Sequence, residues 1–223
     1  MSYKKRHNEI AKAFSDLNNI LEDKKDAYLE KISNIINKAI KNFDDKEFWE
    51  QSYKDIVDYF YAALTDVYLE TTITLKEIYA EISDKVVDIE DFIYKEDKIT
   101  LPKRIKKYWD EVIELLKNPK TDKKEIALYL LAMYDRILAN EMINVKQGIK
   151  KVKKPIDNDG IEVICITDGA CCSNGGVYLA DENPPLPPYH AKCQCEFWYE
   201  FYYPTDEEDL EALQELGWEK EDG

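Results

Sequence analysis

Glycine is confined to the last part of this 223-residue chain. The first glycine is Gly148, and only two prolines, Pro102 and Pro119, interrupt the residues before it. Helix interiors tolerate glycine and proline least, so a long stretch almost free of both can be nearly all helix. All five cysteines and six of the eight prolines fall after Lys154. The sequence therefore predicts an N-terminal helical bundle followed by a module of another kind.

Apolar periodicity divides the helical part into segments. Residues 5–42 carry apolar side chains near a heptad spacing, which predicts one long amphipathic helix. A second helix is expected to run to about residue 85, with Asp44 or Asp45 as its N-cap. Residues 88–98 are polar and aromatic and are interpreted as a connection with a short helical turn.

Two further helices are expected before the glycine-containing part. Pro102 suits the first turn of a third helix, and Asn118-Pro119 ends it. Thr121 is the expected N-cap of a fourth helix, with apolar residues on one face. Gly148 is a natural C-terminal stop for that helix.

Short β segments follow Pro155. Ile161–Ile166 alternates and is rich in β-branched residues, which is typical of a strand. Val177–Leu179 fits a second short strand, and the aromatic segment Phe197–Tyr203 fits a third. A short acidic helix ending at Gly217 is expected in the tail. The predicted fold class is α+β, mostly α, with a helical domain at 1–150, a Cys/His-rich β module at 151–204 and an acidic tail at 205–223.

The charge of the chain is unevenly spread. Acidic residues outnumber basic ones by 46 to 31, and the formal net charge is −15. Thr205–Gly223 alone holds nine acids and one lysine, a net charge of −8. Three of the basic residues are arginine, whereas direct reading of DNA bases relies on arginine. Sequence-specific nucleic-acid binding is therefore not expected.

The hydropathy pattern excludes two further classes. No apolar run approaches the roughly 18 residues that a membrane-spanning helix needs. The first residues lead into an amphipathic pattern without the apolar core of a secretory signal. We therefore expect neither a membrane protein nor a secreted one.

One group of basic residues lies at the start of the expected third helix, and a second group lies at the end of the fourth. Positive charge at the start of a helix opposes the helix dipole, so helix chemistry does not explain the first group, and contact with an acidic partner is an alternative to a merely solvated face. Positive charge at the end of a helix complements the helix dipole, which explains the second group. The first group is Lys103, Arg104, Lys106 and Lys107, and the second is Lys146, Lys150, Lys151, Lys153 and Lys154.

Ligand chemistry is concentrated in one constellation, which holds every cysteine and one of the two histidines. In His190-x-x-Cys193-x-Cys195 the two cysteines point to the same face of an extended segment, so both thiolates can bind one ion. Turn glycines beside Cys171 and Cys172 supply the bends that a metal-binding loop needs. Three cysteines and one histidine, or four cysteines, make the closed tetrahedral set of a structural zinc site.

The predicted zinc ligands are Cys172, His190, Cys193 and Cys195, with Cys171 or Cys165 as an alternative ligand. Adjacent cysteines rarely bind one ion together, because their side chains diverge. Disulfides, unliganded buried thiols and a Cys–His nucleophile are the other interpretations. An odd number of cysteines without an export signal argues against disulfides. A catalytic thiol usually stands alone, which argues against the nucleophile.

The residues of this constellation resemble the C-terminal signature of phage minor head proteins, the Mu F-like or phage head morphogenesis family. The family pattern is an Asp followed by two cysteines, a Gly-x-aromatic step, and a Pro-rich run into His-Pro-x-Cys-Arg-Cys. Ala191 and Gln194 replace the usual Pro and Arg, and the first two cysteines adjoin. The matching segments are Ile166-Thr-Asp168-Gly-Ala-Cys171-Cys172, Gly176-Val-Tyr178 and Pro184-Pro-Leu-Pro-Pro-Tyr-His190-Ala-Lys-Cys193-Gln-Cys195.

The resemblance implies a minor capsid protein of a tailed-phage virion, without catalysis. Such proteins act in head morphogenesis in the host cytoplasm and lie inside the head near the portal. The implied partners are the portal and the capsid or scaffold proteins. The alternative, from another class, is a small zinc- or thiol-dependent enzyme. A weaker third interpretation is non-specific contact with packaged DNA through the lysine groups.

Overall fold

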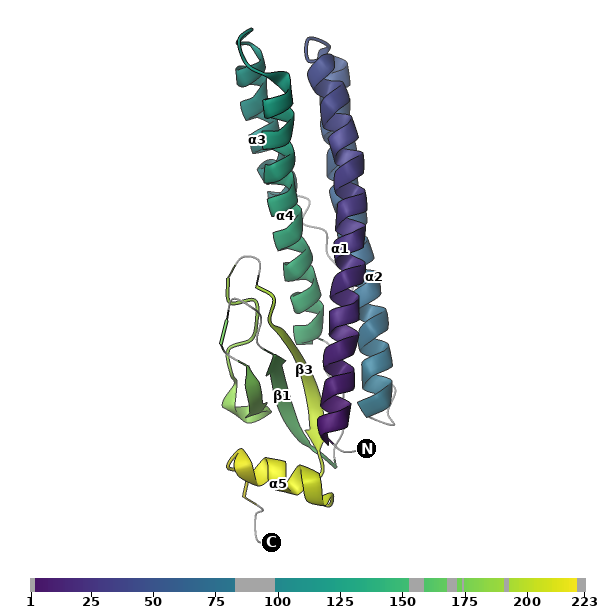
Figure 1. The fold of residues 1–223 in the computed structure, drawn as a ribbon, viewed down its shortest axis with the longest axis vertical. Helices are drawn as coiled ribbons and strands as arrows, with labels where there is room; N and C mark the ends of the chain where they lie inside the picture. Colours follow the sequence, from purple (N-terminus) through teal and green to yellow (C-terminus); the bar gives the residue numbers. More distant parts are fainter. Residues whose placement is uncertain are drawn as a thin grey trace. The chain divides into compact units, whose positions relative to one another are not determined.

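The computed structural model describes residues 3–82, 99–152, 159–167, 172–173, 175–190 and 193–219. This part of the chain holds five α-helices and a three-stranded sheet (Figure 1). The predicted fold class, mostly α with a small sheet and a C-terminal helix, is confirmed. The elements are α1 (Tyr3–Lys41), α2 (Lys46–Ile82), α3 (Thr100–Leu116), α4 (Lys123–Val152), β1 (Ile161–Thr167), β2 (Gly176–Leu179), the 3-10 helix η1 (Ala180–Glu182), β3 (Glu196–Tyr202) and α5 (Glu207–Glu215).

The chain forms two compact units. The helical unit comprises residues 20–68 and 93–145, and the mixed unit comprises residues 1–19, 69–92 and 146–223. Helices α1, α2 and α4 each contribute residues to both units. The domain division at residues 150 and 204 stays a prediction.

Aromatic side chains form the core of the helical unit. Trp49 of α2 stacks on Trp109 of α3, with ring centroids 4.1 Å apart. Phe60 of α2 meets Tyr134 of α4 edge-on, and the Tyr134 hydroxyl donates to the Ile105 carbonyl of α3 at 3.2 Å. The four aromatic side chains are buried. Aromatic pairs of this kind contribute about 0.5–1.5 kcal/mol beyond their burial, so they fix three helices against one another.

The starts of α2 and α4 follow local capping chemistry. Asp45 is the N-cap of α2, as one of the two predictions had it, because its Oδ1 accepts from the Phe48 N–H at 3.0 Å. Pro102 lies in the first turn of α3, as predicted. The prediction of Thr121 as the cap of α4 is wrong. The helix begins at Lys123, and Asp122 Oδ1 accepts from the Lys124 N–H at 2.8 Å.

Gly148 does not end α4, which continues to Val152. A glycine inside a helix costs about 1 kcal/mol relative to alanine. The residues on either side, Gln147 and Ile149, are buried, and their tertiary contacts carry the helix past the glycine. The predicted helical turn within residues 88–98 lies outside the described residues.

The sheet of the mixed unit has the order β2-β1-β3, and both pairings are antiparallel. Ile166 is opposite Gly176 of β2, and Thr167 is opposite Glu196 of β3. The C-terminal end of β1 therefore lies beside the N-terminal ends of its two neighbours. Residues that precede β2 and residues that precede β3 arrive at the same end of the sheet, which brings the cysteine segments together.

The two faces of the sheet carry different side chains. One face is an apolar cluster of Ile164, Ile166, Phe197 and Tyr199. The other face includes Trp198, whose ring centroid lies 5.9 Å from that of Phe14 on α1. All seven residues of β3 are buried, so this strand is covered on both faces.

Helix α5 is anchored to the end of β3. Asp206 caps it by accepting from the N–H groups of Glu208 and Asp209, and the buried Asp209 accepts from the Tyr203 N–H at 3.0 Å. Gly217 follows the helix with φ of 83°, the left-handed conformation that commonly ends a helix. None of the helices in the described part of the chain has the apolar stretch that a membrane span requires.

Candidate metal centre

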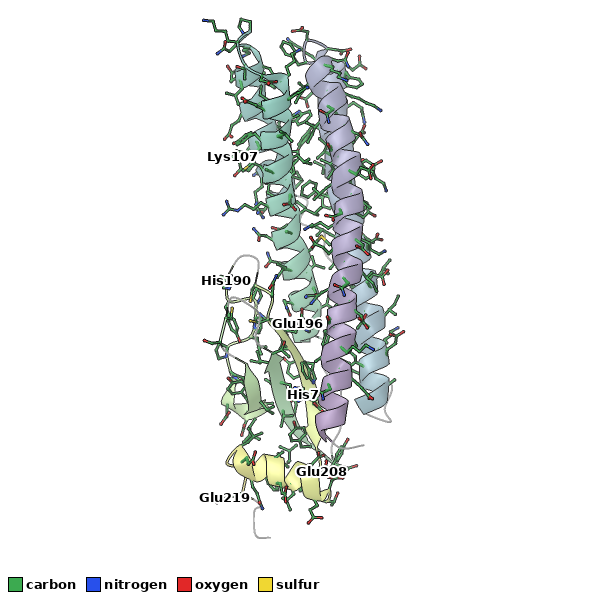
Figure 2. All side chains as sticks on the ribbon, viewed as in Figure 1. His7, Lys107, His190, Glu196, Glu208 and Glu219 are labelled. Atoms are coloured by element: carbon green, nitrogen blue, oxygen red, sulfur yellow. The ribbon has the colours of Figure 1, made fainter. Side chains whose placement is uncertain are left out.

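Cys172, His190 and Cys193 lie together at the end of the sheet where β1 finishes. Their ligand atoms are all within 4.8 Å of one another. The Sγ of Cys172 lies 3.1 Å from Nε2 of His190 and 3.8 Å from Sγ of Cys193. The register of the sheet explains the meeting, because Cys172 precedes β2 whereas His190 and Cys193 precede β3. Figure 2 labels His190 on the segment that leads into β3.

The separation of the two sulfur atoms suits a tetrahedral zinc ion. Two thiolates bound to one zinc at about 2.3 Å each are about 3.8 Å apart, which is the separation of the Cys172 and Cys193 sulfurs. Cys193 is buried, Cys172 is half-buried and His190 is exposed. A thiolate pair with an imidazole beside it is a donor set typical of zinc.

Cys195, the fourth predicted ligand, is not one of the three residues whose ligand atoms lie within 4.8 Å of one another, but it hydrogen-bonds to Cys193. Burial tends to raise the pKa of the Cys193 thiol, but hydrogen bonds from the backbone of Tyr189 and Cys195 and from the side chains of Cys195 and Cys172 lower it overall. A lower pKa favours the thiolate that binds metal. Burial and the neighbouring Cys195 raise the pKa of Tyr189 to about 12. We call Cys172, His190, Cys193 and Cys195 the cysteine–histidine cluster.

The other two cysteines differ from these in position. Cys165 is buried in β1, and its Sγ lies 3.5 Å from Oε2 of Glu200, in a different group of ligand atoms. Cys171, the second alternative ligand, lies outside the described residues. None of the four described cysteines forms a disulfide.

A buried charge cluster lies directly after Cys195. Glu196, at the start of β3, pairs with Lys146 and Lys150 of α4, and the Lys150 Nζ lies 2.6 Å from its Oε2. Asn18 of α1 donates to Glu196 at 3.0 Å and accepts from Lys146 at 2.7 Å. The Lys150 ammonium also lies 3.8 Å from the ring centroid of Phe14. We call Asn18, Lys146, Lys150 and Glu196 the buried charge cluster, and Figure 2 labels its acid.

The protonation of this cluster follows from burial and pairing. Burial acts to raise the pKa of Glu196, but Lys150 and Lys146 outweigh it and hold the pKa at about 2. Burial lowers the pKa of Lys150 to about 8, although Glu196 opposes the change. The interpretation of these two lysines as charges that merely complement the helix dipole is wrong, because both are buried ion-pair partners.

The buried charge cluster is connected to the cysteine–histidine cluster through the backbone. The Gln147 side-chain N–H donates to the Cys195 carbonyl at 3.1 Å, one residue before Glu196. Helix α4 therefore holds both the last cysteine and the acid that follows it. The sequence carries one signal of this arrangement, which is the presence of Glu196 and Glu200 in an otherwise aromatic strand.

No protein-family model, characterised protein or solved structure matches this chain.

Proposed function

We propose that this chain is a structural minor head protein of a tailed phage that acts at or near the portal during capsid assembly. In this proposal Cys172, His190, Cys193 and Cys195 bind one structural zinc ion. The observation that carries it is the convergence of Cys172, His190 and Cys193 within 4.8 Å, because these residues belong to the segments that resemble the family signature. The proposed location is the inside of the head, after assembly in the host cytoplasm.

The composition of the ligand set favours a structural ion. Three sulfurs and one nitrogen fill the four positions of tetrahedral zinc and leave none for water. Catalytic zinc ions keep one position open, and their ligands are richer in histidine and carboxylate. A closed site would tie the segment that precedes β2 to the segment that precedes β3, and would thereby stabilise this end of the small sheet.

The helical unit supports the assembly role. Several large apolar side chains on its helices are exposed, among them Leu128 at 67% and Leu115 at 44%. Surfaces of this kind can bury apolar area against a portal, capsid or scaffold protein, at roughly 25 cal/mol per Å². The exposed charges of the tail alone would give little specific affinity at physiological salt.

Elemental analysis of the purified, reduced protein tests the zinc ion. We expect Cys193→Ser to lose one zinc per chain relative to wild type, because serine is a poor ligand for this ion. The control is Ser173→Ala, an exposed neighbour of Cys172 that offers no ligand to the cluster. Equal zinc content in Cys193→Ser and wild type would refute the metal site.

The assembly role is tested separately. We expect the protein to copurify with the portal protein from the same genome, and to be present at low copy number in purified virions by mass spectrometry. Absence from virions together with no portal binding would refute the role, whatever the zinc content.

A second candidate function rests on the Cys172–His190 contact of 3.1 Å, because a thiol beside an imidazole is the core of a cysteine nucleophile. Alkylation of Cys172 with iodoacetamide separates the two functions. In the structural proposal, zinc protects Cys172 and a chelator exposes it. Rapid alkylation of the zinc-loaded protein would favour the thiol enzyme.

A further inference from the structure

A second group of metal-binding atoms lies in the mixed unit, outside the cysteine–histidine cluster. His7 of α1, Cys165 of β1 and Glu200 of β3 place their ligand atoms within 4.8 Å of one another. Cys165 and Glu200 have no exposed surface, and His7 is half-buried. Three elements thus contribute one thiol, one imidazole and one carboxylate to a common point. Figure 2 labels His7 on α1, apart from His190.

The register of the sheet fixes two of the three groups. Cys165 is opposite Trp198, and Val163 is opposite Glu200, so Cys165 and Glu200 are diagonal neighbours. Side chains alternate along a strand, which places both on the same face. Their separation, 3.5 Å from Sγ to Oε2, therefore follows from the backbone pairing.

Trp198 contacts two of the three residues, Glu200 and His7. Its indole N–H donates to Oε2 of Glu200 at 3.2 Å. Its ring meets the ring of His7 edge-on, with centroids 4.7 Å apart and an interplanar angle of 86°. Metal ligands are commonly oriented by neighbouring groups in this way, which reduces the freedom that they lose when an ion binds.

We infer that His7, Cys165 and Glu200 bind a second zinc ion, separate from the one proposed in the cysteine–histidine cluster. All three donor types are ordinary zinc ligands, whereas calcium and magnesium take oxygen ligands and iron–sulfur clusters take several thiolates. Three protein ligands leave the fourth position for a water molecule.

Charge balance supports a divalent ion at this position. Cys165 releases its thiol proton to solvent when it binds, so one thiolate and the Glu200 carboxylate together carry two negative charges. The ion carries two positive charges, and the His7 imidazole is neutral. The bound site is therefore electrically neutral, which a fully buried carboxylate requires. A nucleophilic role for Cys165 does not fit, because its sulfur has no exposed surface for a substrate to reach.

The variant His7→Phe tests this site with little risk to the fold. Phenylalanine keeps an aromatic ring against Trp198 but has no nitrogen to bind a metal. The control is Asn8→Ala, an exposed residue next to His7 on α1. The readout is zinc per chain by elemental analysis of the full-length protein, after zinc loading and removal of free ion. Circular dichroism establishes that the variants are folded.

We expect His7→Phe to contain one zinc ion fewer than wild type and Asn8→Ala to contain the same number. Glu200→Gln should lose the same ion. In a Cys172→Ser/Cys193→Ser background, which removes the first site, His7→Phe should remove the remaining zinc. Cobalt bound in that background should show a weak thiolate-to-metal band, because one sulfur binds it.

The outcomes separate this inference from the proposed function. Loss of zinc in His7→Phe but not in Cys193→Ser would support the second site and refute the first. Loss in Cys193→Ser but not in His7→Phe would overturn the second site and leave the first. Unchanged zinc content in both variants would overturn both.

Discussion

Replacing Glu196 with glutamine tests the buried charge cluster at the start of β3. The substitution keeps the shape of the side chain but leaves Lys146 and Lys150 buried without their anion. The change of the Glu196 pKa from 4.5 to about 2 corresponds to about 3 kcal/mol of native-state stabilisation, at about 1.4 kcal/mol per pH unit. Removing one partner of a buried ion pair typically costs about 3–5 kcal/mol, which agrees. We therefore expect Glu196→Gln to lower the free energy of unfolding by about 3 kcal/mol at neutral pH.

Urea denaturation followed by circular dichroism measures this loss, and pH provides a second signature. The folded pKa of Glu196 lies below its ordinary value, so its stabilisation is complete above pH 4.5 and is lost as the pH falls toward 2. The difference between wild type and variant should shrink over that range. Burial already lowers the pKa of Lys150, so the variant should become more stable as the pH rises above neutral.

The matched control is Glu114→Gln on α3. Glu114 pairs with Lys117, but its side chain is 73% exposed, and an exposed ion pair of this kind contributes little. Similar unfolding midpoints for Glu196→Gln, Glu114→Gln and wild type would show that the buried charge cluster does not stabilise the fold.

Three further predictions concern other parts of the chain. Gly148→Ala should raise the free energy of unfolding by about 0.5–1 kcal/mol, because the position is helical and an added Cβ meets no atom within 4 Å; an unchanged or lower urea midpoint would contradict this. Gly160→Ala should lower it by about 1–3 kcal/mol, because the added Cβ would lie 2.8 Å from the Phe201 Cβ. Both variants replace glycine with alanine, so their effects on the unfolded chain are similar. Opposite changes in the free energy of unfolding would therefore report the different surroundings of the two positions in the folded state. A chain ended after Pro204 should stay folded and still bind portal in a pull-down, although it loses the buried Leu213; a folded truncation that no longer binds would make the tail the docking element.

Much of the fold was predictable because it depends on local patterns. The absence of glycine before Gly148 indicated helices, and the alternation in Ile161–Ile166 indicated a strand. The errors arose where local chemistry was ambiguous or was overridden. Thr121 and Asp122 are both suitable N-cap residues, and in the structure it is Asp122 whose side chain accepts a hydrogen bond from the first turn of α4. Glycine commonly ends a helix, but α4 continues past Gly148, because the buried residues on both sides of it hold the helix in place.

The meeting of Cys172, His190 and Cys193 was predictable for a different reason, which is that these three residues are close in sequence, whereas Cys195 as the fourth ligand stays a prediction. Cys172, His190 and Cys193 come from two neighbouring segments, and the structure places them together. The buried charge cluster was not predictable, because Lys150 and Glu196 are separated by 46 residues and no periodicity links them. The same holds for His7, which meets Cys165 only through the packing of α1 on the sheet.

The hydrogen bond between Asn18 and Glu196 has a consequence for the order in which the chain folds. The two residues are 178 positions apart, so this contact of the N-terminal part of α1 forms only after β3 has been synthesised. The helical unit ends at Val145 and can close earlier, while the ribosome is still adding the sheet. Contacts between residues far apart in sequence slow folding more than they weaken the folded state. The mixed unit, which holds both candidate zinc sites, is therefore the last to assemble, and the site of His7, Cys165 and Glu200 is complete only once β3 has been synthesised.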